Sequence, residues 1–205
     1  SWASEMCIRD SLYTIISGQA RTNKIDGIPL IELEPEIMPL WEQNMKRLID
    51  VLVSLMVLIL LIPLWIAVAL AIKLTSKGPV FYRQERIGRH GKPFHIIKFR
   101  SMRVDAEAQT GPMLAQKNDP RVTPIGAFLR KTRIDEFPQF INVLKGDMSI
   151  VGPRPERDYF IKQVIKKAPQ FVHLHRVRPG ITSLGQVKYG YAGTIDEIIE
   201  RMKYD

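Results

Sequence analysis

An uncharged apolar run at residues 51–72 limits what this chain can fold into. It reads VLVSLMVLILLIPLWIAVALAI and contains no charged side chain. As a helix, the run rises about 33 Å, which matches the hydrocarbon thickness of a bilayer. A soluble protein would have to cover such a helix on every side, and a chain of 205 residues is too short to do so. We therefore expect this run to insert into a membrane.

A proline near the middle of the run leaves two modes of insertion open. Pro63 removes a backbone donor and clashes with the carbonyl of Ile59, so a kink at this point could return both ends to one face. Transmembrane helices also tolerate proline, so an ordinary single span fits equally well. Positive residues are retained on the cytoplasmic side, and here they flank both ends of the run: Lys46, Arg47, Lys73 and Lys77.

Charge is distributed unevenly along the chain. The total is +9, but residues 1–45 carry a net −4, so the remainder carries +13. The simplest interpretation is a break near residue 45, with residues 1–45 forming a leader or linker left from a preceding domain. The lone Cys7 excludes a disulfide scaffold and a zinc site built from cysteines.

A basic β-hairpin is predicted directly after the apolar run. Residues 79–83 and 94–99 are rich in aromatic and β-branched residues, and Gly88 and Gly91 lie between them. Residues 73–103 contain nine cationic side chains, among them Lys98 and Arg100, against the single acid Glu85. Anionic lipid headgroups, substrate phosphates and nucleic acid would each complement this charge. The adjacent membrane segment makes nucleic acid the weakest of the three.

Asp135 and Glu136 form a carboxylate pair just before a predicted helix. Pro138 is comfortable only in the first helical turn, which predicts Asp135 at the N-cap and Glu136 at the first helical position. Free backbone N–H groups and the upstream Arg130, Lys131 and Arg133 would depress the pKa of Asp135. An ionised aspartate beside cations suits nucleophilic attack on phosphorus, and Glu136 suits Mg²⁺. Ordinary helix capping explains the same two residues.

Two rigid turns present further arginines. Gly152–Pro155 fixes Arg154, and residues 176–182 carry Arg178 beside a Pro-Gly turn. Guanidinium groups match phosphate oxygens well, although each arginine could equally form a surface ion pair. Between the turns, residues 159–175 form a basic amphipathic segment that could lie on a membrane or pack on the core.

Several blocks of the sequence, in order, resemble the bacterial sugar transferases, the monotopic polyprenol-phosphate phosphoglycosyl transferases. The resemblance covers residues 46–190, and its blocks are KRLIDVLVSL, RIGRHGKPFHIIKFRSM, DPRVTPIGAFLRKTRIDEFPQF, NVLKGDMSIVGPRPE and RVRPGIT. It implies a re-entrant membrane helix broken at Pro63, with both ends in the cytoplasm. The family's members face the cytoplasm from the bacterial inner membrane, and the acidic leader fits a larger, multi-domain member.

The resemblance also implies a reaction and its residues. Asp135 would attack the β-phosphate of a UDP-sugar, release UMP and pass the phosphosugar to a polyprenol phosphate. Glu136 would bind Mg²⁺, and Arg130, Arg154 and Arg178 fall in the family's phosphate-binding motifs. Lys98, Arg100 and Gln186 complete the expected substrate-binding set.

Two positions depart from the common family pattern. Many members read Gly-Ile-Thr-Gly followed by a bulky residue near the glutamine, whereas this chain reads Gly180-Ile181-Thr182-Ser183-Leu184-Gly185-Gln186. This loop is expected near the nucleotide or the sugar, so the identity of the sugar stays open. Ile62 precedes Pro63 where serine is frequent.

The expected fold is therefore a helix-rich α+β protein in three parts. They are a leader at 1–45, a re-entrant helix at 46–77 and a compact cytosolic catalytic domain at 78–205. The expected partners are a UDP-sugar, a polyprenol phosphate and anionic lipids, without nucleic acid, and a homodimer is possible. The alternative is a non-catalytic, membrane-anchored basic module, in which Asp135 and Glu136 only cap a helix.

Overall fold

The computed structural model describes residues 22–25, 28–31, 38–104, 106, 113, 119–190 and 192–205, the first two ranges as backbone only. The chain divides into two units, Ser1–Lys46 and Arg47–Asp205. In the first unit, β1 (Thr22–Ile25) and β2 (Ile28–Ile31) pair antiparallel. Most of the predicted leader lies outside the described residues. The second unit is a helix-rich α+β structure, as expected.

The apolar run forms two helices with a sharp bend between them. α2 (Leu40–Leu60) and α3 (Ile62–Thr75) meet at an angle of 61°. Pro63 lies in the first turn of α3, where its missing N–H costs no helical hydrogen bond. Within the described part of the chain, neither helix alone has the length and apolar character to cross a bilayer, whereas the bent pair together has both. The break predicted at Pro63 is therefore present.

One face of α3 packs on the domain, and the other is exposed. Val68 and Ile72 are buried against Phe99 and Leu129, and the ring of Trp65 contacts Phe99 edge to face, with centroids 5.4 Å apart. Large apolar side chains on the opposite face remain exposed: Ile62, Ile66, Leu70 and Leu74. The exposed stripe has nothing to cover it among the described residues.

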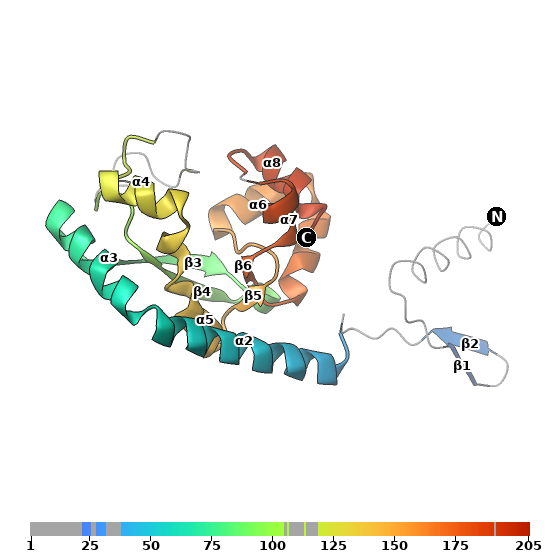
Figure 1. The fold of residues 1–205 in the computed structure, drawn as a ribbon. Helices are drawn as coiled ribbons and strands as arrows, with labels where there is room; N and C mark the ends of the chain where they lie inside the picture. Colours follow the sequence, from blue (N-terminus) through green and yellow to red (C-terminus); the bar gives the residue numbers. More distant parts are fainter. Residues whose placement is uncertain are drawn as a thin grey trace. The chain divides into compact units, whose positions relative to one another are not determined.

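α2 is joined to the domain through polar contacts. Arg47 donates to the carbonyls of Val143 (2.6 Å) and Leu144 (3.0 Å), in the last turn of α5 (Gln139–Lys145). The buried carboxylate of Asp50 accepts from the hydroxyl of Ser149 (2.7 Å) and the backbone N–H of Ile150 (3.2 Å), both in β5 (Ser149–Val151). These bonds hold α2 alongside α5 and β5 (Figure 1).

The predicted β-hairpin is confirmed. β3 (Phe81–Ile87) pairs antiparallel with β4 (Pro93–Phe99) through a short turn, in a register that places Tyr82 opposite Lys98. Phe81 stacks on Phe99 at the end of the hairpin next to α3, with ring centroids 5.4 Å apart. α4 (Pro124–Lys131) lies close to the end of β4, because a Cβ on Gly126 would overlap the carbonyl of Ser101. The hairpin is therefore the central layer between α3 and the cavity described below.

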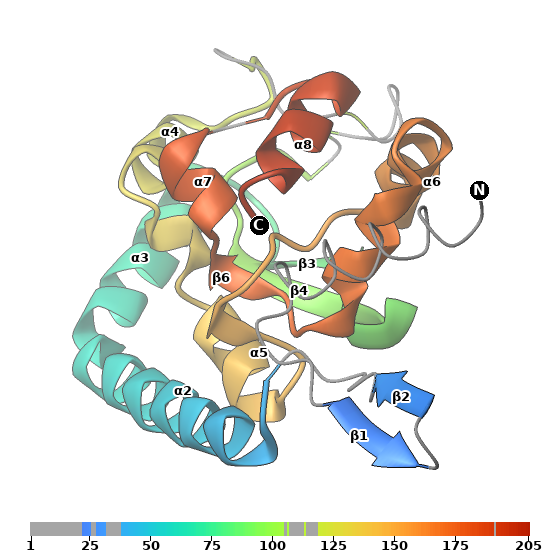
Figure 2. The same cartoon turned by 90° about the vertical axis from the view of Figure 1, so that its right-hand side faces the viewer.

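The C-terminal third forms a second core on the other side of the hairpin (Figure 2). It contains α6 (Asp158–Lys167), a 3-10 segment (Pro169–Arg176), β6 (Gly180–Thr182), α7 (Leu184–Lys188) and α8 (Ile195–Met202). β6 pairs parallel with β5. The apolar residues of the amphipathic segment 159–175, such as Val164 and Phe171, pack against Ile198. This segment therefore packs on the core.

Truncation of Leu129 is expected to destabilise the packing between α3 and α4. Its side chain is fully buried against Ile72 and Phe99, so Leu129→Ala should lower the free energy of unfolding by about 2–5 kcal/mol. The neighbouring Phe128 is 55% exposed and provides the matched control. Thermal unfolding in detergent micelles measures both variants, and equal melting temperatures would contradict the packing described.

Candidate active site

The carboxylate pair lies in a tight turn, one turn earlier than the sequence predicts. Ile134–Glu136 form a 3-10 turn, and α5 begins at Gln139 with Pro138 as its N-cap. An aspartate at the N-cap accepts from the amides two and three residues later. Here the N–H of Phe137 is bonded to the carbonyl of Ile134, and Pro138 has no N–H to offer. The expectation that Asp135 caps the helix is therefore wrong.

A residue in the left-handed conformation starts this turn. Arg133 has a φ of 60°, which is uncommon for a residue with a side chain. Its carbonyl accepts from the N–H of Glu136 at 3.2 Å. The reversal directs the carboxylates of Asp135 and Glu136 into the domain, where both residues are only 7% exposed.

Asp135 is a buried carboxylate with an unpartnered oxygen. Its Oδ1 has no hydrogen-bond partner among the described residues. Burial raises the pKa of Asp135 above its usual value; Glu136 adds to the increase, whereas Lys98 and Arg130 oppose it. The sequence predicts the opposite direction, because it shows the neighbouring cations and not the burial. A poorly solvated carboxylate of this kind is reactive once it is ionised.

Glu136 is surrounded by cations. Its Oε1 lies 2.9 Å from Lys98 Nζ on β4, 3.2 Å from Arg154 Nη2 and 3.9 Å from Arg133 Nη1. Burial alone would raise the pKa of Glu136, but Arg154 and Lys98 hold it well below its usual range. The two adjacent carboxylates therefore differ: one is stabilised in its charged form, and the other is not.

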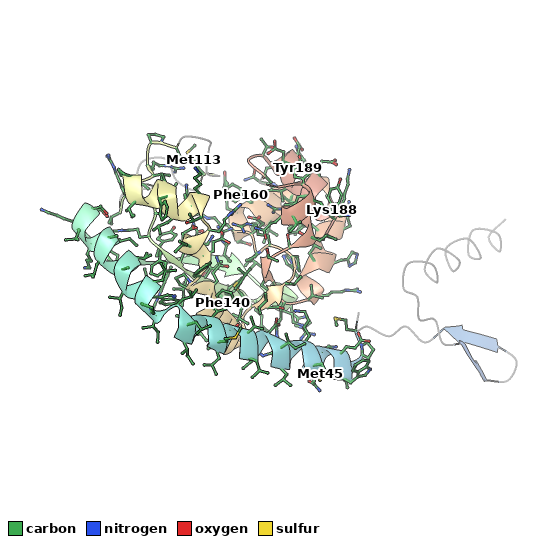
Figure 3. All side chains as sticks on the ribbon, in the orientation of Figure 1. Met45, Met113, Phe140, Phe160, Lys188 and Tyr189 are labelled. Carbon is green, nitrogen blue, oxygen red and sulfur yellow. The ribbon has the colours of Figure 1, made fainter. Side chains whose placement is uncertain are left out.

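A cavity of about 780 Å³ opens over this pair. Met113 and Phe160, labelled in Figure 3, belong to its apolar lining. Its polar lining is strongly cationic, with nine basic side chains against three acidic ones. The basic residues are Arg86, Lys98, Arg100, Arg103, Arg121, Arg130, Arg133, Arg154 and Arg157, and the acidic residues are Asp135, Glu136 and Glu156. Such a cavity suits a ligand with several negative charges, such as a diphosphate.

The structure brings together five of the predicted site residues in the lining of this cavity. Asp135, Glu136, Lys98, Arg130 and Arg154 all line it. Arg130 reaches it from α4, where its Nε donates to the hydroxyl of Ser101 at 3.1 Å.

The other predicted binding residues are placed differently. Arg100 also lines the cavity, but its guanidinium donates to the carbonyls of Ser76 and Lys77, both at 2.9 Å, at the end of α3. Arg178 and Gln186 do not line the cavity. Arg100 therefore stabilises the C-terminal end of α3. The sequence motifs alone did not distinguish Arg100, Arg178 and Gln186 from the residues that meet at the carboxylate pair.

Comparison with known proteins agrees with the geometry. The family model for bacterial sugar transferases matches residues 41–205. The chain belongs to this family. It is 45% identical over 198 residues to the UDP-glucose:undecaprenyl-phosphate glucose-1-phosphate transferase of Klebsiella pneumoniae, covering 95% of this chain and 42% of that protein.

The sugar in the printed name is not the same for every relative. The UDP-N-acetylgalactosamine-undecaprenyl-phosphate N-acetylgalactosaminephosphotransferase of Aeromonas hydrophila is 46% identical over 78% of this chain and 38% of its own length. The Escherichia coli UDP-glucose:undecaprenyl-phosphate glucose-1-phosphate transferase is 40% identical over 95% of this chain and 42% of its own length. The chain thus spans less than half of each of these relatives.

Several cavity residues of this chain could not be singled out from the sequence. Arg86 is held by Gln84 Oε1 (2.7 Å) and Glu156 Oε2 (3.2 Å), and the other oxygen of Glu156 accepts from the buried Arg201 of α8 at 2.6 Å. Tyr82, Gln84 and Arg86 alternate along β3, so one face of the strand supplies all three. This alternation is the sequence signal that could have identified the three residues. The sequence holds no such signal for Glu156 and Arg201, because their partners are 45 or more residues away.

The two carboxylates could supply only some of the ligands of a magnesium ion. Within the described residues there is no group of three or more acidic, histidine or cysteine side chains that could hold a metal. Magnesium in phosphoryl-transfer sites is commonly held by one or two carboxylates and the substrate's own phosphates. The cationic contacts of Glu136 converge on Oε1, and Asp135 Oδ1 has no partner. The pair therefore fits a magnesium ion that arrives with a diphosphate.

Opposite effects on stability are expected from neutralising the two carboxylates. The raised pKa of Asp135 means that its charge destabilises the folded state at neutral pH, so Asp135→Asn should raise the melting temperature. This gain should diminish as the pH falls through the raised pKa of the native carboxyl, and it should vanish below about pH 4, the ordinary aspartate pKa, where the unfolded chain is protonated as well.

Glu136→Gln should instead destabilise the protein at neutral pH. It leaves the buried charges of Lys98 and Arg154 without their counter-ion, at a cost on the order of 3 kcal/mol. Since the pKa of Glu136 is lowered, this deficit should persist on acidification and diminish only below about pH 4. Melting curves across pH test both variants, and shifts of the same sign would contradict this difference.

Proposed function

We propose that this chain transfers a phosphosugar from a UDP-sugar to a membrane polyprenol phosphate and releases UMP. One observation carries the proposal: the buried carboxylate of Asp135, with an unpartnered oxygen, in a cavity lined by nine cations. The names of the relatives support the donor and acceptor classes and a place in polysaccharide synthesis.

Asp135 is the nucleophile of the first step. Its ionised Oδ1 attacks the β-phosphorus of the UDP-sugar, and the bond from that phosphorus to the bridging oxygen breaks. UMP leaves with the bonding electrons, and an aspartyl-phosphosugar remains on the enzyme. Lys98, Arg130 and Arg133 lie near Asp135 and neutralise charge on the phosphoryl oxygens.

The second step moves the phosphosugar to lipid. A phosphate oxygen of the polyprenol phosphate attacks the same phosphorus, which releases Asp135 and forms a polyprenyl-diphosphate-sugar. A covalent intermediate suits this pair of substrates, because one dissolves in water, the other lies in a bilayer, and each reacts in turn.

Glu136 would hold a magnesium ion, which supplies positive charge to the donor's diphosphate. Arg154 and Lys98 fix the Glu136 side chain in the absence of that ion. Arg154 is thereby oriented toward the cavity, where its guanidinium can bind a phosphate oxygen.

The bent pair α2–α3 is the proposed membrane anchor. Its exposed apolar side chains enter the cytoplasmic leaflet of the bacterial inner membrane, and the bend at Pro63 returns both ends to the cytoplasm. The hairpin supports this placement, since Phe81 contacts Trp65 of α3 and also lines the cavity. The reacting phosphorus is then close to the lipid surface, where the acceptor phosphate lies.

Incubation with donor alone tests the proposal. UDP-glucose and UDP-N-acetylgalactosamine, given separately and without acceptor, should include one that releases UMP and adds the mass of one phosphosugar to the protein. Asp135→Asn should form no adduct, and its rate of UMP release should fall by at least about 1,000-fold, as expected for removal of a nucleophile. The matched control is Asp158→Asn, on the exposed side of α6 with an ordinary ion pair to Lys162.

Three outcomes would contradict the mechanism. An adduct on the Asp135→Asn variant would indicate another nucleophile. Release of free sugar phosphate without a lipid product would indicate a phosphohydrolase. Binding of anionic lipid without UMP release from any UDP-sugar would indicate a non-catalytic module.

A further inference from the structure

A second group of arginines lies outside the catalytic cavity. Arg178 is half-buried, and its guanidinium has no hydrogen bond or ion pair with any described residue. The charged groups that act on it are Arg47, Arg89 and Asp50. None of these four residues lines the cavity.

The backbone around this cluster is firmly held. Arg89 Nε donates to the carbonyl of Arg176 at 3.1 Å. Arg176 lies shortly before Arg178 in the segment that leads into β6. The carbonyl of Pro179 accepts from the N–H of Ser149 at 2.9 Å, and the Ser149 hydroxyl donates to Asp50 of α2. Arg178 therefore lies beside α2, positioned by β5 and β6.

The cluster carries an excess of positive charge. The carboxylate of Asp50, its acidic member, is buried and accepts bonds from Ser149 and Ile150. Burial, together with Arg47 and Arg89, lowers the pKa of Arg178. The charged guanidinium of Arg178 is therefore repelled by the two neighbouring arginines. A half-buried arginine without a hydrogen-bond partner among the described residues, beside two further arginines, is suited to bind an anion.

The position along α2 indicates which anion. Arg47 precedes the apolar run by four residues, about one helical turn or 6 Å. Leu48, Ile49 and Leu52, on the same stretch of α2, are each more than half exposed. Cations at the end of an apolar segment lie at the depth of lipid phosphates.

We propose that Arg178, with Arg47 and Arg89, binds the phosphate of an anionic phospholipid headgroup. The site is separate from the cavity that holds the reacting groups. This inference depends on the proposed function only because that proposal places α2 at a membrane. It assigns Arg178 to lipid binding, although the family motif predicts donor binding.

Native mass spectrometry of the full chain in detergent tests this site without any UDP-sugar, so its result does not depend on catalysis. Wild-type protein should retain phosphatidylglycerol in preference to phosphatidylcholine. Arg178→Gln should weaken retention of phosphatidylglycerol about fivefold, the effect of about 1 kcal/mol for one cation near a lipid surface. The control is Lys162→Gln, which removes an exposed charge on α6 and should leave retention unchanged.

A stability measurement separates binding from folding. Without lipid, Arg178→Gln should melt at or above the wild-type temperature, because the substitution relieves repulsion from Arg47 and Arg89. Equal retention of phosphatidylglycerol by wild type and Arg178→Gln would overturn the proposal. Two other results would also overturn it: an equal effect with inorganic phosphate alone, which indicates a free anion site, and preferential retention of farnesyl phosphate, which indicates an acceptor site.

Discussion

The ion pairs at Glu136 Oε1 are the interaction on which the rest of the site depends. One oxygen joins the hairpin through Lys98 and the turn after β5 through Arg154, while its own backbone belongs to the turn before α5. A buried carboxylate persists in its charged form only with such partners. Glu136 therefore sets the position of Asp135, the adjacent residue, whose Oδ1 has no hydrogen-bond partner in the described part of the chain.

The two faces of the hairpin serve different neighbours. At the end next to α3, Phe81 and Phe99 pack with Trp65, so that part of the sheet belongs to an apolar cluster. Lys98 and Arg86 contribute charge to the cavity. The same two-stranded layer therefore contacts α3 and also lines the cavity that holds the carboxylate pair.

Sequence alone identified those parts of the site that local pattern or family motif could indicate. The hairpin, the break at Pro63 and the five residues gathered at the cavity were predicted, because each depends on neighbouring residues or on a recognisable block. The predicted direction of the Asp135 pKa shift was wrong, because the burial of this carboxylate depends on segments that are distant in the sequence. The link from Arg86 through Glu156 to Arg201 was missed for the same reason.

Arg133 shows what the site demands of its backbone. A left-handed conformation costs an ordinary residue about 1–2 kcal/mol, and glycine would adopt it freely. Yet glycine would also remove a guanidinium that lies 3.9 Å from Glu136 Oε1. The chain thus retains local strain together with a positive charge at the carboxylate pair, and a variant selected purely for thermal robustness would be drawn toward the residue that removes this charge.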